Sequence, residues 1–171
     1  EWTMHSQSVL VNTEELISDL ANAETRQRGF LLTEDRSYLE PYRVAIAEVD
    51  QTFNALKELT QDNPQQQARL AELEPFLRER IQLLQRGVSL TEQGNVTAAI
   101  AGVRTNRGQQ IMDQIRAIVT QIKVDERALL EQRSQSERKR LNTVAALTIP
   151  GCLGVALFLE LTVWHLRRNL R

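Results

Sequence analysis

The clearest pattern in the chain is a repeat of apolar positions at alternating steps of three and four residues. This spacing is typical of helices that pack together along one face, because an α-helix has about 3.6 residues per turn. No segment alternates with the period of two that a half-buried strand shows. The sequence therefore predicts four long amphipathic helices. Their stripe positions are Trp2, Ser6, Val9, Thr13, Leu16, Leu20, Ala23, Gln27 and Phe30; Leu39, Tyr42, Ile46, Val49, Phe53 and Leu56; Leu70, Leu73, Leu77, Ile81, Leu84 and Val88; and Ile111, Ile115, Ile118, Ile122, Asp125 and Leu129.

Residues typical of helix ends separate these stripes. Asn63 precedes Pro64, and this pair favours a helix start because proline lacks an N–H that would be unpaired there. Gly94 is expected to end the third helix in the left-handed conformation, and the segment TAAIAGV at 97–103 predicts a short helical turn. Pro75 lies inside the third helix and predicts a bend. Short links between amphipathic helices predict an all-α fold, an antiparallel four-helix bundle.

A stretch without a charged residue, TVAALTIPGCLGVALFL at residues 143–159, follows the fourth stripe. Extended to residues 141–166, it is long enough for a transmembrane helix, which needs about 20 mostly apolar residues. We expect the fourth helix to continue directly into it, because no glycine-rich break follows Gly108. Lys and Arg flank both ends, so their distribution does not decide the orientation. Glu160, near the far end, either snorkels to the interface or is functional.

The stretch AETRQRGFLLTEDRSYLEPY between the first two stripes predicts the tip of a helical hairpin. Glu24 and Arg28 stand four residues apart and can form an ion pair on one helix face. Gly29 costs about 1 kcal/mol inside a helix, which predicts that a neighbouring helix approaches closely there. Ser37 followed by Glu40 three residues later matches a capping box that would start the second helix.

This stretch resembles the signature of the CHASE sensory domain, type three, in which an AET-x-QRG-[FY]-LLT-G turn is followed by YL-x-PY. The resemblance covers essentially residues 1–140. Two positions depart from the family pattern, Glu34 and Arg26, where the family commonly has glycine; both departures leave the fold intact and the ligand preference open. The matching residues are Glu24, Thr25, Gln27, Arg28, Gly29, Leu32, Thr33, Tyr38, Leu39, Pro41 and Tyr42.

The resemblance implies a four-helix extracytoplasmic bundle between two membrane spans, a homodimer, and a cytoplasmic output domain in the same chain. It places residues 1–140 outside a bacterial inner (plasma) membrane, the span at 141–166, and the start of the cytoplasmic region at 167–171. The implied role is the sensory, signal-transducing module of a sensor histidine kinase. Chemoreceptors and diguanylate or adenylate cyclases carry the same domain, so these outputs remain alternatives. The resemblance names no ligand or stimulus.

Composition and motifs argue against an enzyme, a metal site or a nucleic-acid partner. The formal net charge is -1, without the basic excess of nucleic-acid-binding domains. The two histidines, His5 and His165, lie in none of the Glu-x-x-His motifs that a diiron bundle needs. No phosphate-binding glycine loop occurs, and the single cysteine, Cys152, excludes an internal disulfide. We expect no catalytic residue, metal or cofactor in this chain and no phosphoacceptor role for His165.

Polar residues interrupt the stripes at Thr13, Gln27 and Asp125. We expect them to fix the helix register, and Arg28 and Arg116 to satisfy them. A small-molecule site between the helices is the alternative. A bundle that only anchors and oligomerises the chain, and senses nothing, is the alternative to a sensor.

Overall fold

The computed structural model describes residues 2–132, 134 and 135. It divides the chain into two compact units, Glu1–Arg127 and Ala128–Arg171. The predicted transmembrane helix at 141–166 and the predicted cytoplasmic start at 167–171 lie outside the described residues. Within the described part, no helix is both long enough and apolar enough to cross a membrane.

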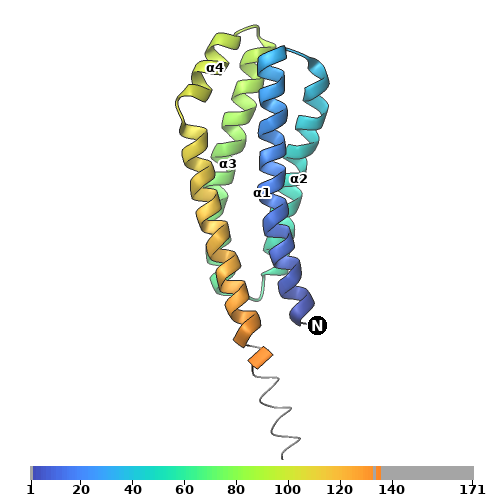
Figure 1. Cartoon of the computed structure of the whole chain (residues 1–171), viewed down its shortest axis with the longest axis vertical. Helices are drawn as coiled ribbons and strands as arrows, with labels where there is room; N and C mark the ends of the chain where they lie inside the picture. Colours follow the sequence, from blue (N-terminus) through green and yellow to red (C-terminus); the bar gives the residue numbers. More distant parts are fainter. Residues whose placement is uncertain (1, 133, 136–171) are drawn as a thin grey trace, which may run out of the picture. The chain divides into compact units, whose positions relative to one another are not determined.

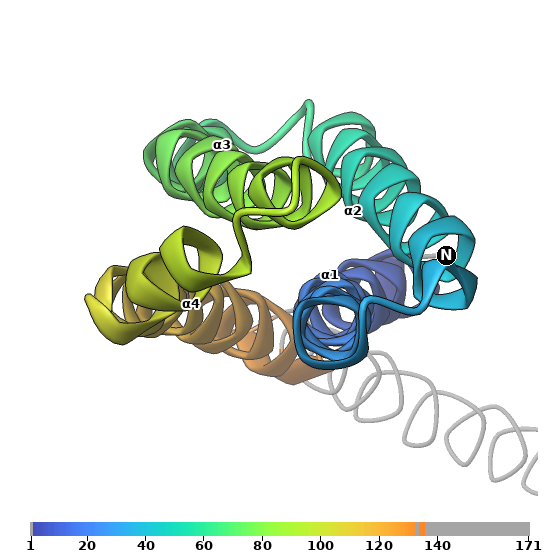
Figure 2. The same cartoon turned by 90° about the horizontal axis from the view of Figure 1, so that it is seen from above.

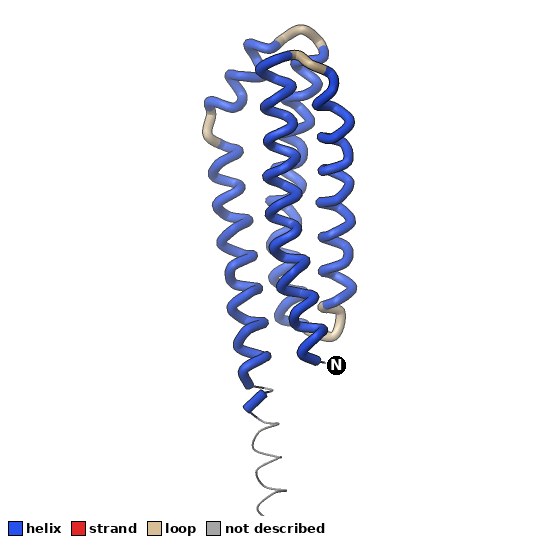
Figure 3. Tube along the Cα trace, turned by 45° about the vertical axis from the view of Figure 1, so that its right-hand side comes forward, coloured by secondary structure: helices blue, strands red, loops and turns tan. Residues whose placement is uncertain are grey.

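All described elements are helical, so the predicted all-α class is confirmed, and the described residues contain no strand. Figure 1 shows α1, α2, α3 and the helix that begins at residue 107 side by side, each antiparallel to its predecessor among these four. Seen end-on in Figure 2, they surround a common centre, and the tan segments of Figure 3 are the short links. The elements are α1 (Trp2–Thr33), the 3-10 helix η1 (Arg36–Tyr38), α2 (Leu39–Leu59), α3 (Pro64–Glu92), α4 (Val96–Arg104) and a helix over residues 107–132.

The predicted helix ends of the second half are confirmed. The side chain of Asn63 accepts a hydrogen bond from the backbone N–H of Gln66, and Pro64 opens α3. Gly94 has a φ of 78°, the left-handed conformation that glycine adopts without steric cost. The short helix predicted at 97–103 is α4. The sequence reasoning missed its cap, Asn95, whose side chain accepts from the backbone N–H of Ala98.

The stripes predicted from the sequence form most of the core, but four of their positions are only partly buried: Ile46, Ile81, Asp125 and Leu129. On α3 the prediction placed Ile81 in the stripe, but Ile81 is only partly buried and Arg80 is buried instead. On the last helix it placed Asp125 there, but Asp125 is partly exposed and Glu126 is buried. On the last helix the buried face drifts relative to a strict repeat of seven residues, whereas on α3 Arg80 continues the alternating steps of three and four residues, and only its charge argued against burial.

Candidate functional site

The chain turns at the tip of α1 through a residue in the left-handed conformation. Glu34 has a φ of 56°, which is uncommon for a residue with a Cβ. Asp35 then accepts a hydrogen bond from the backbone N–H of Ser37 at 2.8 Å. This bond, with a further one from the Ser37 hydroxyl, holds the pKa of the Asp35 carboxyl below its ordinary value. Asp35 is therefore the cap of η1.

The predicted capping box of Ser37 and Glu40 is wrong. The residue before α2 is Tyr38, and no side chain caps that helix end. The reason is that η1 lies between the turn and α2, so the unpaired N–H groups occur earlier, at the start of η1, where Asp35 accepts from one of them. Pro41 lies in the first turn of α2, where its missing N–H costs nothing.

Gly29 is packed against the ring of Tyr38. A Cβ placed on Gly29 would lie 2.6 Å from Cδ1 and 2.8 Å from Cζ of that ring, which is inside van der Waals contact. The close approach predicted at Gly29 is therefore present, and its partner is a side chain on η1. Because glycine has no side chain, the ring of Tyr38 on η1 can pack directly against α1 at residue 29.

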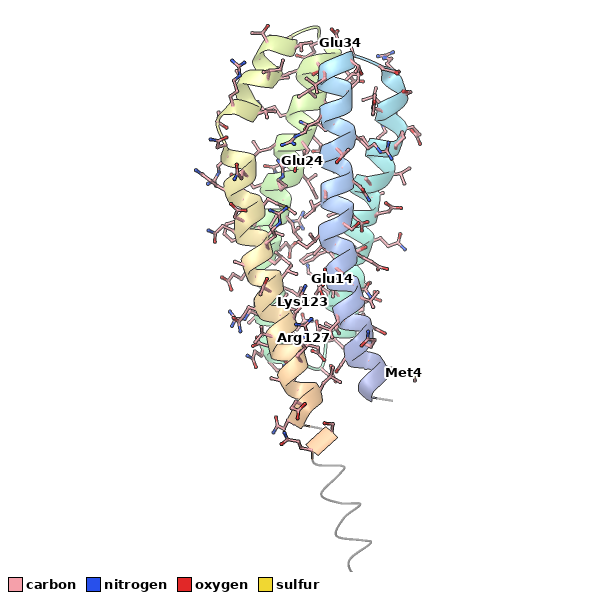
Figure 4. The ribbon with its side chains drawn as sticks, viewed as in Figure 1. Met4, Glu14, Glu24, Glu34, Lys123 and Arg127 are labelled. Carbon is pink, nitrogen blue, oxygen red and sulfur yellow. The ribbon has the colours of Figure 1, made fainter. Side chains whose placement is uncertain are left out.

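A buried arginine crosses the interior below the tip. Arg80, on α3, is 7% exposed, and its Nη2 lies 2.7 Å from Oε2 of Glu24 on α1. The other carboxylate oxygen of Glu24, Oε1, lies 2.6 Å from Nη2 of Arg28. Glu24 therefore holds one exposed and one buried guanidinium, and the predicted pair of Glu24 with Arg28 is confirmed. Figure 4 labels Glu24 part of the way along α1.

Two glycines make room for this arrangement. Nη1 of Arg80 lies 2.5 Å from the position that a Cβ on Gly108 would take, so the guanidinium reaches the first turn of the 107–132 helix. Gln27 Nε2 donates to the backbone oxygen of Leu84 at 3.4 Å and overlaps the position of a Cβ on Gly87. We call Glu24, Gln27 and Arg80 the Arg80 layer.

Tyr42 extends the polar interior toward the tip. It is 5% exposed, and its hydroxyl oxygen has no hydrogen-bond partner within the described part of the chain. Burial raises the pKa of this hydroxyl to about 12, and the charge of Arg80 opposes the shift. The ring thus carries an unsatisfied polar group in the core, which costs stability.

A second polar contact lies near the α2–α3 link. Gln66 is fully buried, and its Nε2 donates to Glu126 Oε2 at 3.2 Å and to the backbone oxygen of Ile122 at 3.2 Å. Asp125, next to this buried contact, pairs at the surface with Arg69 at 3.5 Å. The buried polar group of the last helix is therefore Glu126.

The expected partners of the polar stripe residues are wrong. Thr13 Oγ1 donates to the backbone oxygen of Leu10 in its own helix. Arg28 pairs with Glu24, and Arg116 pairs with Asp113 at 3.5 Å. Each of these arginines finds a carboxylate three or four residues away on its own helix, which is closer than a neighbouring helix.

An open groove of about 800 Å³ lies between the N-terminal part of α1 and the C-terminal end of α2. Most of its lining residues have polar side chains, among them Glu58 and Asp62. No group of three or more His, Cys, Asp or Glu side chains that could hold a metal ion occurs among the residues the structure describes. The complete lining is His5, Ser8, Asn12, Ala55, Glu58, Leu59, Gln61 and Asp62.

A family model, described as the CHASE3 domain, matches residues 1–136. The chain belongs to the CHASE3 domain family. Among solved structures, the chain is similar to the sensor domain of the histidine kinase HK9 of Rhodopseudomonas palustris, with 28% identity and a TM-score of 0.69. The similarity covers 74% of this chain and 98% of that one. No curated protein matches the chain.

Membership of the CHASE3 family and the similarity to a kinase sensor domain make this chain a sensory module of a receptor. The CHASE3 signature residues fall into two groups in the structure. Gln27, Leu39 and Tyr42 are buried in the core, whereas Leu32 is 78% exposed and Thr25, Arg28, Thr33 and Pro41 also face solvent. Gly29 and Tyr38 pack on each other, and Glu24 pairs with the exposed Arg28 of the signature and with the buried Arg80 of α3.

The sequence reasoning missed Arg80, Asp35 and Glu126. Arg80 lies three residues after Leu77 and four before Leu84, so the alternating steps of three and four residues pass through it. Asp35 directly follows Glu34, the position at which the family commonly has glycine. Aspartate is a common residue at the start of a helix, where its side chain caps the free N–H groups. The spacing therefore contained the signal for Arg80, and only its charge argued against burial.

Proposed function

We propose that the chain is the extracytoplasmic sensory module of a bacterial sensor histidine kinase. In this proposal residues 1–140 form an antiparallel four-helix bundle outside the inner membrane, residues 141–166 span it, and 167–171 begin the cytoplasmic part. The observation that carries the proposal is the match to a kinase sensor domain along 98% of that domain's length. The CHASE3 match to residues 1–136 supports it independently.

The chain itself acts without catalysis, and the receptor works as a homodimer whose cytoplasmic output domain lies in the same chain. The stimulus is carried by the helix that begins at residue 107, which is helical through residue 132 and, in this proposal, continues into the membrane. A rigid helix can carry a shift or rotation between two states of a sensor to an output domain. A chemoreceptor or cyclase output would use the same helix.

The test is autophosphorylation of the full-length receptor in membrane vesicles. Ser134→Gly with Gln135→Gly should interrupt the helix that carries the stimulus, because glycine lowers helix stability by about 1 kcal/mol per residue. The matched control is Ser134→Ala with Gln135→Ala, which keeps a helix. A third receptor lacks residues 1–132.

We expect the alanine variant to phosphorylate at the wild-type rate, and the glycine variant to match the receptor without residues 1–132. A glycine variant with the wild-type rate would refute transmission through this helix. Absence of any phosphorylation in the full-length receptor, with cyclase activity in its place, would favour the cyclase alternative.

A further inference from the structure

The apolar core consists of two separate clusters of buried residues. The tip cluster contains residues of α1, α2, α3 and α4, and the base cluster contains residues of α1, α2, α3 and the 107–132 helix. The tip cluster is Ala23, Phe30, Leu31, Leu39, Tyr42, Ala45, Leu84, Val88 and Ala99. The base cluster is Val9, Leu16, Leu20, Val49, Phe53, Leu56, Leu70, Leu73, Leu77, Ile111, Met112, Ile115, Ile118, Val119 and Ile122.

Arg80 lies at the boundary between the two clusters. Along α3, Leu77 belongs to the base cluster and Leu84 to the tip cluster, and Arg80 lies between them in the sequence. Its guanidinium is held on α1 by Glu24. Arg80 therefore stands between the buried apolar residues of the two clusters on α3, while the partly buried Ile81 and Leu83 that follow it still pack against the base cluster.

The links of the chain follow the same division. α4 contributes only to the tip cluster, through Ala99, and the 107–132 helix contributes only to the base cluster. Between them lies a break at Thr105 and Asn106, where Asn106 has a φ of 57°. Gly108, two residues later, is the point at which the first turn of the 107–132 helix meets Arg80.

We propose that the Arg80 layer divides the fold into two cooperative units, so that the tip opens and closes while the base stays folded. Cooperative units of this kind follow contiguous sets of buried apolar contacts, and the layer is where that contiguity ends. Because Arg80 touches Glu24 in the signature and Gly108 at the start of the 107–132 helix, a movement of the tip reaches that helix at its first turn. Only this last consequence rests on the proposed sensor function.

The test is hydrogen exchange, followed by mass spectrometry, of the 171-residue chain in detergent micelles. The test variant, Glu24→Leu with Arg80→Met, replaces the ion pair by apolar side chains and joins the clusters. The matched control, Glu79→Leu with Arg107→Met, changes the neighbouring ion pair in the same way. That pair is exposed and bonded at 2.7 Å, and it joins α3, the helix of Arg80, to the first residue of the 107–132 helix.

In the wild type we expect helical amides of the tip cluster to exchange as a group, about tenfold or more faster than those of the base cluster. The test variant should reduce this ratio to about twofold, and the control should leave it unchanged. Equal exchange of both clusters in the wild type would overturn the proposal, whatever the variants do. So would a folded test variant that keeps the wild-type ratio. Neither readout depends on receptor output, so a failed sensor function would not affect them.

Discussion

The contact between Gly29 and Tyr38 gives a substitution whose effect should change sign with its background. Alanine at residue 29 gains roughly 1 kcal/mol of helix propensity over glycine. Its Cβ would also lie 2.6 Å from Cδ1 of Tyr38, and overpacking of this kind costs roughly 1–3 kcal/mol. We therefore expect Gly29→Ala to lower the free energy of unfolding by about 1 kcal/mol in the wild type.

When Tyr38→Ala removes the ring, the same Gly29→Ala change should raise the free energy of unfolding by about 1 kcal/mol. The double-mutant cycle then gives a coupling of about 2 kcal/mol, within the range for residues in contact. Urea unfolding of the 171-residue chain in detergent, followed by circular dichroism at 222 nm as a general measure of helix, supplies the four free energies.

Gly102 provides the control, because it lies inside α4 and, apart from its two chain neighbours and the backbone of its own helix, nothing lies within 4 Å of the position of its Cβ. Gly102→Ala should stabilise the chain by about 1 kcal/mol in both backgrounds. If Gly29→Ala stabilised the wild type as Gly102→Ala does, the ring of Tyr38 would not occupy the space beside residue 29. The steric account of the signature glycine would then be refuted.

Four further substitutions have defined outcomes in the same unfolding assay. Glu34→Gly should raise the free energy of unfolding by about 1 kcal/mol, because φ is 56° at this residue. Asn106→Gly, at a φ of 57°, should raise it less, since asparagine tolerates this conformation. Equal gains from the two substitutions would contradict the argument. Gly87→Ala should destabilise by about 1–3 kcal/mol, because its Cβ would overlap Gln27 Nε2; a neutral effect would show that Gln27 moves freely. Tyr42 has a pKa raised from 10.0 to about 12 in the folded chain, so the folded state holds the proton of its hydroxyl more tightly than the unfolded state does. This contribution to the free energy of unfolding is fully present below pH 10 and should fall by roughly 2 kcal/mol as the pH rises to 12. Tyr42→Phe should remove that part of the loss, and an unchanged pH profile would count against a buried hydroxyl.

The helices could be predicted because their burial pattern repeats and their ends carry residues with one favoured conformation. Leu16, Leu20 and Leu73 occupy the stripe positions assigned to them and are buried. Asn63 and Gly94 perform the capping roles expected of them, because these roles depend only on local backbone geometry.

The polar interior could not be predicted because its partners lie far apart in the sequence. Whether Arg80 is buried depends on Glu24 of another helix, and on a glycine at residue 108 that leaves space for the guanidinium. The capping box failed for a related reason: the four-residue pattern of Ser37 and Glu40 does not reveal that η1 precedes α2. The bend predicted at Pro75, which does lie inside α3, stays a prediction.

The central claim is that residues 1–140 face the outside of the inner membrane and that residues 141–166 cross it. Leu32 is 78% exposed at the end of α1, so Leu32→Cys presents a reactive thiol. Cys152→Ser removes the single native cysteine, and Asn169→Cys marks the other side of the span.

Intact cells that produce the full-length protein are treated with a membrane-impermeant maleimide before and after permeabilisation. The account predicts that Leu32→Cys is labelled in intact cells, whereas Asn169→Cys is labelled only after permeabilisation. Labelling of both positions under the same condition, or the reverse order, would contradict it.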